Sequence, residues 1–163
     1  MSVNKHRPHI FVLPEDDANH ALANGFRLNP NLSQRSIQVL PSAGGWIKVQ
    51  SQFAMEHILP MERYQLRHMV LLLDFDEMAK RRDEVSKVVP PHLCERVFIL
   101  GVWSEPENLK KAGLGSLESV GSKLALECEN ETRITWDHEL LRHNNIELVR
   151  MASKLKHILF PLT

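Results

Sequence analysis

Apolar residues in the first hundred positions follow two alternating patterns, which are short continuous runs and longer stretches where they recur every three or four residues. The short runs predict four β-strands, at residues 9–13, 36–40, 68–73 and 96–101. The longer stretches predict helices at residues 15–26, 46–59 and 75–86, with Pro60 ending the second. Strands that alternate with helices pair in parallel, so we expect a three-layer, Rossmann-like α/β fold.

The last third of the chain has the pattern of helices alone. From Ser116 onward an apolar stripe includes Gly121, and a glycine on such a stripe indicates close approach to another element. A final helical pair is predicted at residues 136–142 and 145–160. The apolar positions of its second helix that we expect to face the core are Ile146, Val149, Ala152, Leu155 and Leu159.

The composition is that of an ordinary globular protein, with 43% apolar and 25% charged residues. Its length of 163 residues predicts one domain over positions 1–163, with an α/β core at 9–101 and a C-terminal helical extension at 116–160. The 20 basic residues balance the 20 acidic ones. This balance argues against a general binder of polyanions.

The sequence carries no sign of a membrane or of secretion. No apolar run approaches the roughly 18 residues of a membrane span. The polar residues 1–9 lack the apolar segment of a signal peptide. The two cysteines, Cys94 and Cys128, do not form a Cys-x-x-Cys pair. We therefore expect a cytoplasmic protein with reduced thiols and no membrane contact.

Acidic residues follow two of the predicted strands. Asp74 and Asp76 come directly after the apolar run 71–73, and Glu15 follows the first strand. The carboxyl ends of parallel strands face one crevice, and side chains two apart on extended backbone point to the same side. The three carboxylates would form an oxygen cage for Mg²⁺ or Mn²⁺. The alternative is that such acids cap the following helix, which also fits Asp16.

Gly44 and Gly45 separate the second predicted strand from its helix. Two glycines in that place would let backbone N–H groups approach a phosphate. The alternative is a tight turn that only glycine makes. The loop lacks the Gly-Lys-Ser/Thr ending of a P-loop. A short basic run, Lys80-Arg81-Arg82, would either steer a phosphate backbone to the acids or form a solvated helix face.

The order of these motifs resembles the Toprim domain family, which includes primases, topoisomerases and small stand-alone bacterial proteins. By this resemblance, Glu15, Asp74 and Asp76 would bind Mg²⁺, and Glu15 would move a proton as phosphodiester bonds are broken or made. Gly44 or Gly45 would match the family's loop glycine. The chain departs from the family at Asp16-Asp17, where many members have glycine, and at Pro14 before Glu15.

Three functions follow as hypotheses. The first is Mg²⁺-dependent phosphodiester chemistry, most simply nucleolytic cleavage of DNA or RNA. The second is a non-catalytic or partner-dependent subunit of a defence or nucleic-acid-processing complex. It would work beside an ATPase and dock through its C-terminal helices, and the neutral charge favours it. The third is a receiver-like phosphoacceptor domain, in which Asp74 would be phosphorylated beside the acidic pair Asp16-Asp17.

Overall fold

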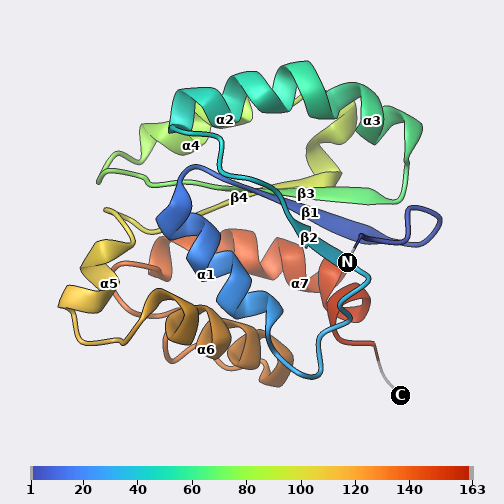
Figure 1. The fold of residues 1–163 in the computed structure, drawn as a ribbon. Coiled ribbons are helices and arrows are strands. Elements are labelled where there is room, and N and C mark those ends of the chain that lie inside the picture. The colour runs from blue at the N-terminus through green and yellow to red at the C-terminus, as the bar shows by residue number, and fades with distance from the viewer. Residues whose placement is uncertain (1, 162–163) are drawn as a thin grey trace.

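The computed structural model describes residues 2–161. Its centre is a four-stranded, all-parallel β-sheet in the order β2-β1-β3-β4, covered by helices on both faces (Figure 1). The strands are β1 (His9–Pro14), β2 (Ile37–Val39), β3 (Arg67–Leu72) and β4 (Val97–Leu100). The predicted α/β class, the three layers and the parallel pairing are therefore confirmed, and the fold is Rossmann-like.

The two helical layers differ in origin. The upper layer of Figure 1 holds α2 (Trp46–Gln52), α3 (Ile58–Arg63) and α4 (Lys80–Ser86). The lower layer holds α1 (Asp17–Arg27), α5 (Glu107–Lys111), α6 (Leu117–Asn130) and α7 (Asn145–Leu159). The segment that the sequence suggested as a C-terminal extension supplies most of the lower layer. None of the helices within residues 2–161 is long and apolar enough to cross a membrane.

Alternation along the strands builds a separate apolar core on each face of the sheet. In β1, Phe11 and Leu13 join the upper core, while Ile10 and Val12 join the lower one. Successive side chains of a strand point to opposite faces, so a strand covered on both sides reads as one continuous apolar run. This is why the apolar runs of the sequence located all four strands.

Two glycines bring α1 and α6 together in the lower layer. A Cβ on Gly121 would lie 2.1 Å from the backbone oxygen of Leu22, and one on Gly25 would lie 2.1 Å from that of Glu118. Any side chain at either position would therefore force the helices apart. The close approach that we predicted at Gly121 is confirmed.

Pro60 does not end the second predicted helix, as we had expected. The chain continues from α2 through a π-helical turn at Phe53–His57 into α3, which runs past Pro60 to Arg63. A proline inside a helix removes one N–H donor and crowds the carbonyl four residues earlier. The wider π turn directly before α3 relieves this conflict.

The predicted helix at residues 75–86 is shorter than expected, because α4 begins only at Lys80. Residues 75–79 form a loop in which Asp76 and Glu77 have φ values of 52° and 58°. The Asp76 N–H donates to Ser104 O at 3.2 Å, and the Glu77 N–H donates to Trp103 O at 2.7 Å. The loop is thus bonded to the segment after β4, and these bonds replace the first turns of a helix.

The predicted helix at residues 136–142 is absent, and only a short 3-10 turn at Arg142–Asn144 forms there. The buried carboxylate of Glu127 accepts hydrogen bonds from the backbone N–H groups of Thr135 and Trp136. The Trp136 indole donates to Leu124 O at 3.1 Å. These contacts hold the segment against α6 in a turn.

The face of α7 that meets the core was also predicted wrongly in part. Ile146 is 87% exposed and Val149 is 60% exposed, whereas Leu148 is buried. The reason lies at the free edge of β4. Glu147 accepts from the Ile99 N–H at 2.9 Å, and Arg150 donates to Val97 O at 2.6 Å. The backbone N–H and C=O groups at a free sheet edge lack strand partners. Here polar side chains of α7 bond to them, and these bonds set the rotation of the helix.

Candidate functional site

The strand order places a topological switch point between β1 and β3. Along the chain, β1 is followed by α1 in the lower layer, and β2 is followed by α2 in the upper layer (Figure 1). Ligands of open α/β sheets bind beyond the carboxyl ends of the strands at such a point. Glu15 follows β1 and Asp74 follows β3 by two residues, so both lie at this edge.

Glu15 is buried, with 7% of its surface exposed, and it joins the ends of the two central strands. Its Oε2 accepts a hydrogen bond from the Asp74 N–H at 2.5 Å. Burial raises the pKa of Glu15, and the hydrogen bond from Asp74 works in the opposite direction. The carboxylate therefore holds the backbone at Asp74 in place as well as lying beside its side chain.

Asp74 is the half-buried carboxyl at the centre of this edge. Its Oδ1 accepts from Asn19 Nδ2 at 2.8 Å. Burial raises the pKa of Asp74, the bond from Asn19 lowers it, and the negative charges of Glu15, Asp16 and Glu107 raise it, with a net value of about 7. Asp74 therefore exchanges a proton near neutral pH.

Asn19 is a member of the site that the sequence did not reveal. It is fully buried on α1, and its N–H and Nδ2 both donate to Asp16 Oδ1 at 3.0 Å. Its own Oδ1 is buried without a hydrogen-bond partner among residues 2–161. The available signal was a polar residue three positions after Asp16, at the start of a predicted helix. Asp16 itself caps α1, as the alternative interpretation of these acids proposed.

Asp76 lies apart from this pair. Its side chain is 73% exposed, and its nearest cation is Arg81, whose Nη2 lies 3.5 Å from Oδ2. The expectation that Asp74 and Asp76 point to one side assumed extended backbone, and the φ of 52° at Asp76 removes that condition. The part of the chain that the structure describes contains no group of three or more His, Cys, Asp or Glu that could hold a metal ion.

The Gly44-Gly45 loop lies against Glu15. The N–H groups of Gly44 and Gly45 donate to the backbone oxygen of Glu15 at 2.7 and 3.1 Å. Their φ values of 98° and 144° explain why glycine stands at both positions. These two donors are already used, so a phosphate at the loop would need others. The Lys48 side chain lies over the loop, with Cδ 3.4 Å from the place of a Cβ on Gly44.

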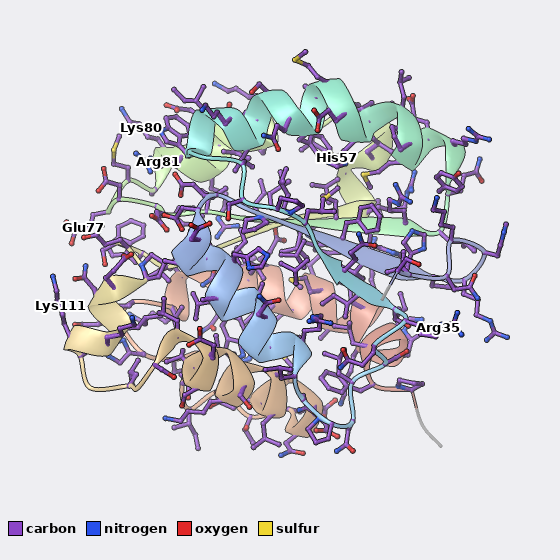
Figure 2. All side chains as sticks on the ribbon, in the orientation of Figure 1. Arg35, His57, Glu77, Lys80, Arg81 and Lys111 are labelled. Atoms are coloured by element: carbon purple, nitrogen blue, oxygen red, sulfur yellow. The ribbon has the colours of Figure 1, made fainter. Side chains whose placement is uncertain are left out.

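The basic run at the start of α4 is largely internal. Arg81 Nη1 donates to Asp74 O at 2.8 Å, and its guanidinium lies 4.6 Å from the centre of the Trp46 ring. Arg82 bonds to the Ile99 carbonyl and lies 3.7 Å from Glu147. Only Lys80 projects freely, at the same end of the molecule as Glu77 and Lys111 (Figure 2). Two of the three cations therefore hold the sheet edge together.

No family profile, curated protein or solved structure matches the chain.

Proposed function

We propose that the edge formed by Glu15, Asp74 and Asn19 binds Mg²⁺, or Mn²⁺ in its place, and carries out phosphodiester chemistry, most simply cleavage of DNA or RNA. The observation that carries the proposal is Asp74. It is a half-buried carboxyl at the switch point, and burial, together with three acidic neighbours, raises its pKa to about 7. Such a group is stabilised by taking up a proton or by binding a cation.

The oxygen atoms at this edge fit a hard cation. Mg²⁺ in proteins uses one or two carboxylates and completes its shell with water and substrate phosphate. Asp74 and Glu15 supply the carboxylates, and Asn19, whose Nδ2 donates to Asp74, has a buried Oδ1 without a hydrogen-bond partner among residues 2–161. When bound, the metal would polarise a phosphate and activate water. Asp76 would join the set only if residues 75–79 rearranged.

The protein's own groups have three parts in this proposal. Asp74 would hold the cation and lose its proton when the cation binds. Glu15, fixed by the Asp74 N–H, would share the cation or move a proton, and burial raises its pKa in the direction that a proton carrier needs. Lys48, over the glycine loop, supplies a cation close to the edge for a phosphate oxygen. The Toprim-like resemblance stays a prediction within this proposal.

A cleavage assay on metal-stripped protein tests the proposal. Supercoiled plasmid, single-stranded DNA and structured RNA are each supplied with Mg²⁺, Mn²⁺ or chelator. We expect metal-dependent cleavage that is lost in Asp74→Asn. The matched control is Asp17→Asn, because Asp17 lies on the same edge but bonds to Ser42 Oγ at 2.8 Å. Equal cleavage by wild type and Asp74→Asn would contradict the assignment.

A partner-dependent subunit is the second candidate, and one observation favours it. Ile134 is 84% exposed and Ile146 is 87% exposed, both in the C-terminal region that the sequence suggested for docking. Exposed apolar side chains mark a contact site where they form a patch, and Ile146 and Val149 lie three residues apart on α7, on one face of the helix. In that case the purified chain would bind metal without cleaving any substrate, and cleavage would require its partner, for which an ATPase is the first candidate to test. Light scattering of the mixture would detect the complex.

The receiver-like hypothesis receives less support from the geometry. That hypothesis pairs Asp16 and Asp17 beside Asp74. In the structure Asp16 bonds to Asn19, and Asp17 bonds to Ser42.

A further inference from the structure

A cavity of about 370 Å³ lies in the lower layer, between the sheet and the helices α1, α6 and α7. Its inner wall is apolar and includes Val12 and Val70 of the sheet, Leu22 and Ala23 of α1, Leu124 of α6 and Leu155 of α7. Large side chains also border the cavity, among them Phe26 of α1, Trp136 and Phe160. The lower layer thus leaves an apolar space against this face of the sheet.

The packing of the lower layer explains the cavity. Gly25 and Gly121 draw α6 tightly onto α1, on one side of the sheet face. Glu147 and Arg150 tie α7 to the free edge of β4, on the other side. The helices that cover this face are therefore held at its two borders, and the cavity lies between them. The hollow follows from contacts that α1, α6 and α7 need for other reasons.

An apolar space of this size suits a ligand better than it suits water. Buried water needs two to four polar partners, and apolar cavities stay dry or take up apolar molecules. Binding pockets for small molecules occupy about 300–1,000 Å³ and have mostly apolar walls with a few polar groups. The polar side chains of this wall that lie deepest are already satisfied, since Glu127 accepts from Thr135 and Trp136 N–H groups. The interior thus selects an apolar chain.

The mouth of the cavity carries the charge that would select a head group. Its exposed lining residues include Val149 and Ala152 of α7 and Glu131 at the end of α6. Lys156 is paired with Glu131 at 2.7 Å. Arg133 also lines the cavity and forms no ion pair with any residue between 2 and 161. One cation is therefore left at the mouth for an anionic group.

We propose that this cavity binds a single-chain carboxylate, with its hydrocarbon chain between α1 and α7 and its carboxylate at Arg133. Arginine holds a carboxylate with two parallel N–H donors, which fixes the head group at the mouth. The site is separate from the acidic edge and does not depend on the function proposed for it. Binding would stabilise the folded chain by mass action.

Dodecanoate, titrated below its micelle-forming concentration and followed by calorimetry and thermal unfolding, is the probe. We expect saturable binding, a raised melting temperature and weaker binding of octanoate. Ala152→Trp, which fills the mouth, should weaken binding about tenfold or more. The control is Ala54→Trp, an exposed alanine in the π turn of the upper layer, which should bind as wild type does.

Arg133→Gln tests the head group and does not depend on how Ala152→Trp folds. Wild type should prefer dodecanoate over dodecyltrimethylammonium, which has the same chain and the opposite charge, and Arg133→Gln should lose that preference. The proposal is overturned if dodecanoate does not saturate the protein, or if folded Ala152→Trp binds it as wild type does. Equal affinity of wild type for the two amphiphiles would also overturn it.

Discussion

The two aspartates that follow β3 lie in opposite environments, although one residue separates them. Asp74 is half-buried and bonded to Asn19, and burial together with the nearby acids raises its pKa to about 7. Asp76 is 73% exposed on a loop with positive φ and faces Arg81. The two aspartates therefore differ in burial and in their neighbours. The difference arises because Glu15 fixes the end of β3, whereas the segment after β4 fixes the loop that carries Asp76. The raised pKa belongs to the first region, and the cation binding that we propose is assigned to that region alone.

The largest expected effect comes from Asp74→Asn. We expect Mg²⁺-dependent cleavage to fall by about a hundredfold or more, because the variant loses the charge that holds the cation. The metal-free variant should at the same time be at least as stable as wild type in urea, since a half-buried charge among like charges opposes folding. A variant that loses activity only because it unfolds would contradict the role given to Asp74.

Glu15 should matter for stability as well as activity. Glu15→Ala leaves the Asp74 N–H without its partner, and we expect it to lower the free energy of unfolding by about 1–3 kcal/mol. Glu15→Gln should recover most of that loss, because its amide oxygen still accepts the same hydrogen bond. Urea unfolding of the two variants makes the measurement. If both lose the same amount, the bond to Asp74 is not what stabilises the strand ends.

The stability of metal-free protein should depend on pH through Asp74. Its pKa is about 7 in the folded chain against an ordinary 3.8, so the folded state holds the proton more tightly. Wild type should therefore lose stability as pH rises from about 4 to 7, and Asp74→Asn should lose about 1–2 kcal/mol less. This figure is below the full linkage value because Asp74 is only half-buried. Parallel pH profiles for the two proteins would contradict the raised pKa.

The smallest effects are expected in the loop. Asp76→Gly removes the strain of a non-glycine residue at φ 52° and should raise the free energy of unfolding by less than about 1 kcal/mol, because glycine also gains freedom in the unfolded chain. Cleavage by this variant should stay within a few-fold of wild type. A large loss of activity on Asp76→Gly would bring Asp76 back into the site and remove the contrast with Asp74.

The sequence predicted the strands and the acidic edge because both depend on short stretches of chain. A buried parallel strand is a continuous apolar run, and the residue after it lies at the ligand edge wherever the strand pairs. This is how Glu15 and Asp74 were found. The metal ion and the chemistry at this edge remain predictions.

The remainder depended on contacts between segments distant in the sequence. Asn19 belongs to the site because α1 lies beside the end of β3, a contact that the sequence does not predict. Asp76 lies outside the site because its loop is hydrogen-bonded to residues after β4. The helical pattern of the sequence does not predict such bonds. The rotation of α7 followed from the unpaired groups of an edge strand, which cannot be recognised before the strand order is known. The cavity also depends on contacts between distant segments, namely those of α1 with α6 and of α7 with β4.

The central claim is that the site is built on Asp74 and excludes Asp76. The most direct test compares metal-stripped wild type, Asp74→Asn and Asp76→Asn in parallel, with Mg²⁺ or Mn²⁺ binding measured by calorimetry and cleavage measured on plasmid, single-stranded DNA and RNA. We predict that Asp74→Asn loses both metal binding and cleavage, while Asp76→Asn keeps both. Loss of metal binding in Asp76→Asn, with Asp74→Asn unaffected, would contradict the account.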